Sequence, residues 1–211
     1  NVFRDPVTGG YAWMLDWDGK QARVLDDTRH CYGMAFVMLA YAHALKAGVE
    51  EARGWLTETF DLAEQHFWEP AAQLYADEAG PDWKTSPYRG QNANMHACEA
   101  MIYCYVATGE RRYIERAEML AHAITVRQAA LANNLIWEHY KQDWSVDWEY
   151  NLHDKTNIYR PWGYQPGHHA EWAKLLLQLD AHLPADWHLP RAEALFAAAV
   201  NAVFGLILAW V

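Results

Sequence analysis

The sequence predicts an all-α fold made of three helical hairpins, each a pair of antiparallel helices joined by a short turn. Two observations lead to this prediction. Apolar residues recur at helical spacing in paired segments, and the short turns within pairs alternate with much longer connections between pairs. The chain has 211 residues, 52% of them hydrophobic, so it can bury one sizeable core, and we expect residues 1–211 to form a single domain.

The six predicted helices form consecutive pairs that cover residues 29–47 with 50–67, 92–108 with 111–127, and 168–182 with 190–203. Residues that stop helices separate the members of each pair. Gly48 is a plausible stop in the first pair, and the second pair turns at Gly109 and Glu110. The third turns through residues 183–186, where Pro184 cannot continue a helix.

The connections between pairs are long enough to do more than close the chain. They cover residues 68–91 and 128–167, about 24 and about 40 residues by difference, and loops of this length usually carry function. Two alternating runs, Leu135–Tyr140 and Trp144–Tyr150, predict short strands within the second connection.

The helix starts should gather at one end of the molecule. In a row of antiparallel hairpins the first helix of every pair runs in the same direction, and both long connections lead into those first helices. We therefore expect one loop-covered rim where polar residues from three helix starts face one another.

The candidates for this rim share a position at or just before the start of a first helix, and they are Arg29, Tyr32, Phe36, Asn92, His96, Glu99, Arg160, His168 and Glu171. His169 points about 100° away from His168 and is a weaker candidate. Each residue alone is more often structural: a helical histidine is more often a hydrogen-bonded core or surface residue than a catalyst, and the alternatives for Arg29 and Arg160 are a solvated charge and a loop anchor. The convergence of three helix starts favours a site.

Aromatic residues are frequent in the long connections, where we find Trp68, Trp83, Tyr88, Trp137, Tyr140, Trp144, Trp148, Tyr150, Tyr159, Trp162 and Tyr164. Flat rings stack on the C–H faces of sugars while their polar edges stay hydrogen-bonded, so several of them would suit a carbohydrate pocket. The alternative is that they fill an irregular core.

Composition excludes several partners. The chain has 17 basic and 27 acidic residues, and the resulting net charge of −10 would repel nucleic acids and anionic lipids. No apolar run reaches the length that spans a bilayer. The three cysteines, Cys31, Cys98 and Cys104, lack CxxC spacing and suit a reducing cytoplasm.

Metal binding is the natural rival for His96, His168 and Glu171, since two histidines and a carboxylate can hold zinc or iron. No HExxH-type spacing supports such a site. Residues 16–19 have the beginning of a calcium loop, but the glycine is misplaced and Asp27 stands where the twelfth-position glutamate belongs. We predict no metal and no cofactor.

Three segments form recognisable motifs. The first is RGQNANMH at residues 89–96, the second is RPWGYQPGH at 160–168 with EWAKLL at 171–176, and the third is RHCYGMAF at 29–36. With the intervening hairpins, they resemble the mannose isomerase branch of the acylglucosamine 2-epimerase superfamily over about residues 8–203. EWAKLL favours this branch over the acylglucosamine and cellobiose 2-epimerases.

The resemblance implies an (α/α)6 toroid, of which this chain would hold about half. It also implies a metal-free interconversion of D-mannose, or a related aldohexose, and D-fructose through a cis-enediol. It assigns ring opening or proton transfer to His168 with Glu171 beside it. It assigns contacts with the sugar hydroxyls and the enediolate to Tyr32, Asn92, His96 and Arg160.

Histidine suits this chemistry because removing a proton next to a carbonyl needs a base with a pKa near neutrality, together with a donor for the developing oxyanion. His168 follows Pro166 and Gly167 at a helix start. We expect the positive end of the helix to favour the neutral, basic form of its imidazole.

The family also has features that this sequence does not match. An initial hairpin with another substrate-binding arginine would precede Val7, and a second catalytic histidine would follow Val200, where residues 201–211 form an apolar tail. A gene fragment or frameshift is the interpretation we favour for the tail, and a terminal strand or interface segment is the alternative. An arc of three hairpins would expose apolar flanks, so we expect low solubility or self-association.

Three classes of function stay open. The first is the isomerase, or a related 2-epimerase. The second is a glycoside hydrolase or lyase, for which Glu99 and Glu171 would be the paired carboxylates. The third is a non-catalytic sugar-binding remnant that binds a monosaccharide without turnover.

Overall fold

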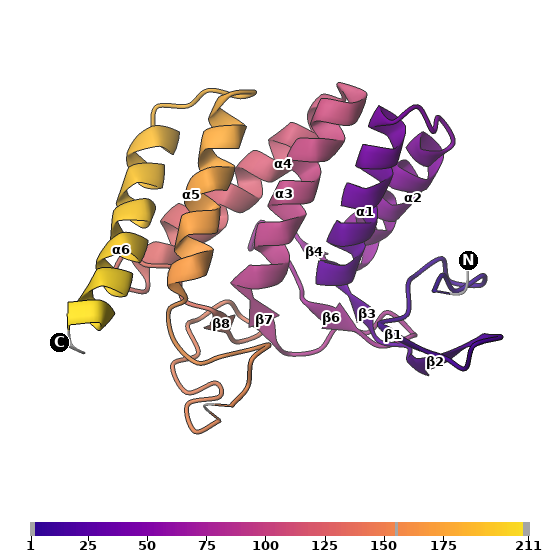
Figure 1. Ribbon diagram of the computed structural model, residues 1–211, viewed down its shortest axis with the longest axis horizontal. Helices are drawn as coiled ribbons and strands as arrows, with labels where there is room; N and C mark the ends of the chain where they lie inside the picture. The colour runs from indigo at the N-terminus through magenta and orange to yellow at the C-terminus, as the bar shows by residue number, and fades with distance from the viewer. Residues whose placement is uncertain (1–2, 155, 209–211) are drawn as a thin grey trace.

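The computed structural model describes residues 3–154 and 156–208, in which α-helices form three hairpins arranged in a row (Figure 1). The helices of the described residues are α1 Cys31–Lys46, α2 Ala52–His66, α3 Gln91–Thr108, α4 Arg111–His122, α5 Pro166–Asp180 and α6 His188–Leu208. The row runs from α1–α2 through α3–α4 to α5–α6. The predicted all-α class with three hairpins is confirmed.

The predicted helix stops are also confirmed. Gly48 and Gly109 have φ angles of +94° and +74°, a left-handed conformation that glycine adopts without a steric penalty. Pro184 lies in the turn between α5 and α6. The helix of α4 continues as a π-helical segment, η1 Ala123–Gln128, and then as helix to Ala130, so the second hairpin ends three residues beyond the predicted position.

The last helix extends beyond its predicted end. We expected it to stop at residue 203, with an apolar tail after it, but α6 continues to Leu208. Apolar residues such as Val203 are compatible with a helix interior, and after Pro190 in the first turn no proline or glycine occurs before Gly205. The end of the tail, residues 209–211, lies outside the described residues.

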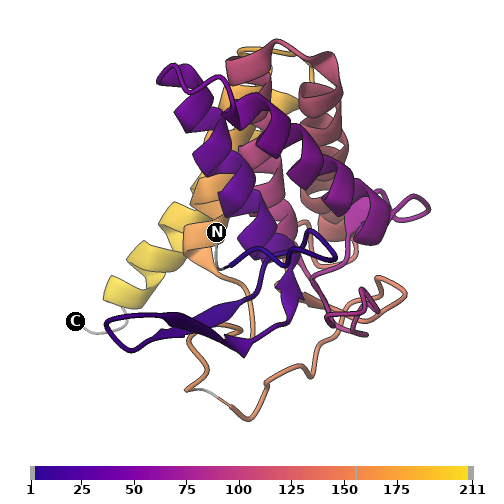
Figure 2. The same ribbon diagram turned by 90° about the vertical axis from the view of Figure 1, so that its right-hand side faces the viewer.

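Short antiparallel strand pairs connect the loops at the N-terminal ends of α1, α3 and α5 (Figures 1 and 2). The pairs are β1 Met14–Trp17 with β2 Ala22–Asp26, β3 Arg29–His30 with β6 Glu78–Ala79, β4 Trp68–Glu69 with β5 Leu74–Tyr75, and β7 Arg89–Gly90 with β8 His139–Tyr140. Residues that are distant in sequence thereby meet at one end of the helical layer.

The strand predictions are partly wrong. In the run Leu135–Tyr140 only β8 is a strand, and in the run Trp144–Tyr150 a single bridge joins Val146 to Tyr140 before the chain enters turns. The side chains of Trp137 and Trp144 are buried instead of alternating with exposed positions, because this loop packs onto the helical core.

The β1–β2 hairpin was not predicted. Its turn contains Asp18, whose carboxylate accepts the backbone N–H groups of Lys20 and Gln21, each at 2.9 Å. Gly19 follows with a φ angle of +90°. The acidic segment at residues 16–19 is thus an Asx-type turn.

The core lies between the helices of neighbouring hairpins. Met34 and Met38 of α1, Leu56 of α2, Met101 of α3 and Tyr113 of α4 are all at most 1% exposed. Burying side chains of this size stabilises the fold by about 1.5–3 kcal/mol each. The three cysteines are free and buried, as suits small apolar side chains.

Arg89 fixes the two long loops to each other. Its buried guanidinium binds Glu69 through two hydrogen bonds, of 3.0 and 2.5 Å, and donates to the backbone carbonyls of Ser86 and Tyr88. Trp144 donates to the same Glu69 carboxylate at 2.6 Å. The arginine of the RGQNANMH motif is therefore structural and holds the loops over the start of α3.

Within the described residues, no helix is both long enough and apolar enough to cross a membrane.

Candidate functional site

A cleft of about 850 Å³ lies at the rim where α1, α3 and α5 begin, within the size range of small-molecule sites. It is lined by Trp13, Met14, His30, Tyr32, Asp77, Tyr88, Asn92, Ala93, Glu138, His139, Ile158, Tyr159, Arg160, Pro161, Gln165, Gly167 and His168. Four predicted site residues, Tyr32, Asn92, Arg160 and His168, are among them. The expected convergence of three helix starts is confirmed.

Two loops are attached to the helix starts in the same way. The first N–H group of α1, on Cys31, donates to the backbone carbonyl of Asp77 at 2.8 Å. The first N–H group of α3, on Gln91, donates to the backbone carbonyl of Glu138 at 3.1 Å. These bonds satisfy amide groups that a helix start leaves free, and they place the carboxyl groups of Asp77 and Glu138 in the cleft wall.

His168 lies in the first turn of α5 with one ring nitrogen engaged by the cleft wall. Its Nδ1 is 2.9 Å from Oε1 of Glu138 and 2.9 Å from Nε2 of Gln91. Gln91 also donates to Oε2 of Glu138 at 3.0 Å, and Trp172 donates to Oε1 of Gln91 at 2.7 Å. The result is a connected group of four side chains from α3, α5 and the loop before β8.

The expectation that the helix start favours neutral His168 is wrong. Burial works against the charged imidazolium, but the hydrogen bond and the negative charge of Glu138 outweigh it, and Glu171 adds to them. The pKa of His168 is therefore raised above its ordinary value. A carboxylate at hydrogen-bond distance has a larger effect than the partial charge of a helix end.

Arg160 supplies a fixed positive charge in the cleft. Its Nη2 donates to Oε2 of Glu78 at 2.7 Å, its Nη1 donates to Tyr150 at 3.3 Å, and its guanidinium lies 4.0 Å from the ring centre of Tyr88. Burial lowers the pKa of Arg160, but Tyr150, Tyr88 and Glu78 together raise it above the usual value. The side chain is held by three partners and stays charged.

Asp77 is a buried carboxyl group on the same wall. One oxygen accepts the backbone N–H of Gly90 at 2.5 Å. Burial raises the pKa of Asp77 to about 8, although the bond from Gly90 and the charges of Arg160 and Arg89 work in the opposite direction. At neutral pH this carboxyl group is largely protonated, so it can donate a hydrogen bond to a ligand.

Asn92 and Tyr32 complete the polar lining. The Oδ1 atom of Asn92 is buried and has no hydrogen-bond partner among the described residues, so it is available to a polar ligand. The ring of Tyr32 meets the ring of His96 edge to face, with centroids 5.0 Å apart. Burial, followed by the charge of Glu171, raises the pKa of Tyr32 and keeps its hydroxyl protonated.

His96 and Glu171 lie beside the described lining of the cleft, beyond Tyr32. Together with Glu99 they form a cluster in which each side chain offers one nitrogen or oxygen atom that could bind a metal ion, and these three atoms lie within 4.8 Å of one another. Lys174 donates to Glu99 at 2.9 Å, so an ammonium group already supplies positive charge there. The rival metal set of His96, His168 and Glu171 does not come together: among the described residues Glu99 is the third member of the cluster, and His168 contacts Glu138 instead.

We predicted that Arg29 shares one face of the first helix with Tyr32 and Phe36 and so belongs to the site. It is not among the described residues that line the cleft. The helix begins two residues later than expected, and Arg29 belongs to β3. Its side chain is 3% exposed and donates to Asp5 at 2.6 Å and to Thr8 at 3.1 Å. It therefore fixes the N-terminal segment and is neither a site residue nor a solvated charge.

Most of the loop aromatics form core. Of those expected to line a pocket, only Tyr88 and Tyr159 appear in the described lining of the cleft. Trp137, Tyr140 and Trp144 are buried in the hydrophobic core. The aromatic content of the loops reflects mainly their packing against the helices.

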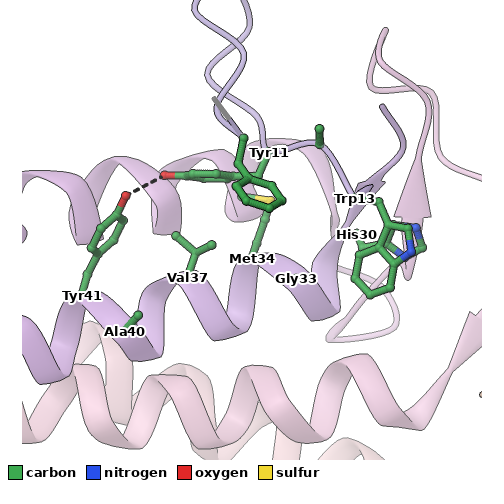
Figure 3. Close-up of a pocket in the computed structure, with 10 residues that line it drawn as sticks. Tyr11, Trp13, His30, Gly33, Met34, Val37, Ala40 and Tyr41 are labelled. Atoms are coloured by element: carbon green, nitrogen blue, oxygen red, sulfur yellow. Dashed lines mark hydrogen bonds between the residues drawn. The ribbon is translucent and has the colours of Figure 1, made fainter. Parts of the chain in front are cut away.

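A second, mostly apolar groove of about 320 Å³ lies along α1 under the N-terminal segment (Figure 3). Figure 3 shows Val37 and Ala40 on α1 between Tyr41 and Met34, with Tyr11 above them. The hydroxyl groups of Tyr11 and Tyr41 are 3.4 Å apart. Trp13 and His30 line both this groove and the cleft, and the centroids of their rings are 4.2 Å apart.

Taken together, the hairpin row and its rim define a helical protein with a polar cleft that holds a cation, a protonated acid and a carboxylate-bound histidine. The family model for N-acylglucosamine 2-epimerase matches residues 1–205. The chain belongs to the N-acylglucosamine 2-epimerase family, and its three hairpins are a partial (α/α) toroid.

Among its relatives, the D-mannose isomerase of Marinomonas mediterranea is 54% identical over 90% of this chain and 48% of the relative. The D-mannose isomerase of Thermobifida fusca is 40% identical over 93% of this chain and 48% of the relative. A crystal structure of a D-mannose isomerase matches with a TM-score of 0.88 and 52% identity over 92% of this chain and 49% of that chain. The chain thus spans about half the length of the curated relatives it matches.

Proposed function

We propose that this chain is an aldose–ketose isomerase that interconverts D-mannose and D-fructose through a cis-enediol. The observation that carries the proposal is the position of His168 in the cleft, bound to Glu138. The relatives named D-mannose isomerase, which align with about nine-tenths of the chain, support the choice of substrate.

In this proposal the open-chain sugar lies with its first two carbons facing His168. The imidazole removes the proton from C2 of mannose, and the electrons of that C–H bond form the enediolate as negative charge develops on the carbonyl oxygen at C1. The imidazolium, whose proton exchanges with solvent, then delivers a proton to C1, and transfer of the hydroxyl proton from O2 to O1 gives fructose without any change in overall composition. One base can serve both carbons because the cis-enediol presents them on the same face.

The cleft also supplies the groups that this charge requires. Arg160 is a held cation, Asn92 has a free polar end, and protonated Asp77 is a donor. Preorganised donors and cations of this kind stabilise developing oxyanions by several kcal/mol, on the order of 3 for one donor. We assign contacts with the sugar hydroxyls to Tyr32, Asn92 and Arg160.

His96 and Glu171 have a less direct place in this proposal. Glu171 adds negative charge near His168, and His96 packs against the ring of Tyr32. We assign Glu171 to proton transfer beside His168 and His96 to substrate binding through the end of the cleft near Tyr32. The buried free thiols fit the expected reducing cytoplasm.

The alternatives have less support from the site. A glycoside hydrolase would need Glu99 and Glu171 facing a glycosidic bond, but Glu99 binds Lys174 and His96 and is absent from the described lining of the cleft. A 2-epimerase of the same family would use the same cleft and return the proton to C2. A sugar-binding remnant would bind the monosaccharide without exchanging its protons.

One assay separates these functions. The protein is incubated with D-mannose, with D-fructose and with a panel of mannosides, and the products are resolved by chromatography. Interconversion of the two hexoses supports the isomerase, and conversion of mannose to glucose supports the epimerase. Cleavage of a mannoside, or sugar binding with no product of any kind, would overturn the proposal.

A further inference from the structure

We propose that Glu138 is a positioning residue that holds the imidazole of His168 in its Nδ1–H form and leaves Nε2 free to act in the cleft. This inference rests on the proposed function, in which His168 carries the proton. Glu138 itself touches the histidine and is 30 positions away from it in the sequence.

The tautomer follows from what surrounds Nδ1. Oε1 of Glu138 and Nε2 of Gln91 each lie 2.9 Å from this nitrogen, so it faces one acceptor and one donor. If Nδ1 carried a lone pair, that lone pair would point at a carboxylate oxygen with a full negative charge. A proton on Nδ1 turns this repulsion into a charge-assisted hydrogen bond, which is about twice as strong as the neutral bond from Gln91.

The carboxylate is fixed from its other side. The indole N–H of Trp172 is only a donor, and its bond to Oε1 of Gln91 determines which way the amide group of Gln91 faces. The amide NH₂ group of Gln91 must therefore point to Glu138, where it binds Oε2 at 3.0 Å. Gln91 and Trp172 are fully buried and Glu138 is 4% exposed, so this chain of bonds has little freedom.

The other titratable groups near His168 do not compete for Nδ1. Glu171 acts on the imidazole through its charge, without a hydrogen bond among the described contacts. His169 is engaged elsewhere, since its Nε2 accepts the N–H of Ile136 at 3.1 Å and its Nδ1 faces the carbonyl of Gln165 at 2.8 Å. Glu138 is thus the residue that sets the tautomer of His168.

The orientation has a chemical consequence. With Nδ1 buried against Glu138, the edge of the ring that contains Nε2 is the part left to the cleft, and the His168 side chain is 26% exposed. A carboxylate behind a histidine fixes the ring and stabilises the imidazolium that forms when Nε2 accepts a proton. Without it, the neutral ring would distribute its proton between both nitrogens.

The test is the ¹⁵N NMR spectrum of histidine-labelled protein, recorded through a pH titration, with the His168 signals assigned by their loss in His168→Asn. The wild type should show the Nδ1–H form of neutral His168. In Glu138→Gln, which keeps the size of the side chain but removes its charge, we expect a mixture of tautomers and a lower His168 pKa. Glu171→Gln should keep the Nδ1–H form, and the exposed Glu193→Gln is the matched control.

The proposal is overturned if neutral His168 in the wild type has its proton on Nε2, or if Glu138→Gln leaves both the tautomer and the pKa unchanged. The wild-type spectrum alone decides the first point, even if Glu138→Gln does not fold. In an active protein, Glu138→Gln should also lower kcat about tenfold or more with little change in KM. Because the spectra need no turnover, a correct tautomer in a protein that does not isomerise sugars would contradict the proposed function and not this inference.

Discussion

Asp77 has a carboxyl group whose protonation links the cleft to the stability of the fold. Its pKa is raised from 3.8 to about 8 in the folded protein, because burial disfavours the charged form. The folded state therefore binds one more proton than the unfolded state between about pH 4 and pH 8. The stability that this group contributes is fully present below its unfolded pKa and is lost as the pH rises through the folded pKa.

We expect Asp77→Asn to remove this pH dependence, since the amide oxygen can still accept the N–H of Gly90. Measured by thermal unfolding, the Tm of the variant relative to wild type should be several degrees higher at pH 9 than at pH 5. The exposed Asp61→Asn is the control. A difference in Tm that is the same at both pH values would show that Asp77 is ionised in the folded protein.

For single residues, the sequence predicted members of the cleft that lie within its three motifs. The places of Tyr32, Asn92 and His168 in the cleft could be predicted because they stand at helix starts that the topology brings together, and Arg160 belongs to the motif that leads into the third of these helices. The places of Asp77 and Glu138 could not be predicted, because each joins the cleft through a loop. In both residues the backbone carbonyl accepts the first N–H of a helix, and because any residue type can make this bond, it cannot be predicted from the sequence.

At the scale of elements, Gly90 is where β7 meets α3, and its lack of a side chain permits the close approach of the cleft wall. A Cβ atom there would lie 2.7 Å from the hydroxyl of Tyr88 and 2.9 Å from Oδ1 of Asp77. Neither neighbour has room to move freely, because Asp77 is buried and Tyr88 is bonded to His139 at 2.9 Å.

We therefore predict that Gly90→Ala destabilises the protein by about 1–3 kcal/mol, as overpacking usually does. Gly54→Ala is the matched control, because Gly54 lies within α2 with nothing within 4 Å of the added Cβ. That change should stabilise the protein by about 0.5–1 kcal/mol through helix propensity. Chemical denaturation measures both, and equal effects of the two substitutions would contradict the packing described for Gly90.

Helices could be predicted closely and strands could not, for a physical reason. A helix of 15 residues repeats its apolar pattern several times, as α5 does, whereas β3 and β7 each have two residues and no period to detect. The error over Arg29 has the same origin. Its helical spacing with Tyr32 is real, but pairing with β6 holds it in an extended conformation before the helix begins.

For the whole molecule, the groove along α1 predicts self-association. Val37, Ala40 and Tyr41 line a groove that is mostly apolar, and the chain matches only about half the length of its relatives. We propose that this face associates with a second copy when the chain is alone. Sedimentation velocity should show species larger than the 24.3 kDa monomer that increase with concentration.

Substituting Val37→Glu should shift this equilibrium toward the monomer, since it puts a charge into the apolar groove. Val49→Glu, at an exposed site in the turn after α1, is the control and should leave association unchanged. A single monomer at all concentrations of the wild type would refute the proposal.

We also propose that the three hairpins form one domain, since buried residues of all three belong to a common hydrophobic cluster. Fluorescence and far-ultraviolet circular dichroism should then report one coincident unfolding transition in urea. Two separate transitions would contradict a single domain.

The central claim, that His168 carries a proton between sugar carbons, is tested most directly by solvent exchange. D-Mannose is incubated with the wild type and with His168→Asn in D₂O, and deuterium at C1 of the fructose product is followed by NMR. We predict deuterium incorporation by the wild type and a loss of about 100-fold or more in the variant. Exchange by His168→Asn at the rate of the wild type, or none by the wild type, would contradict the account.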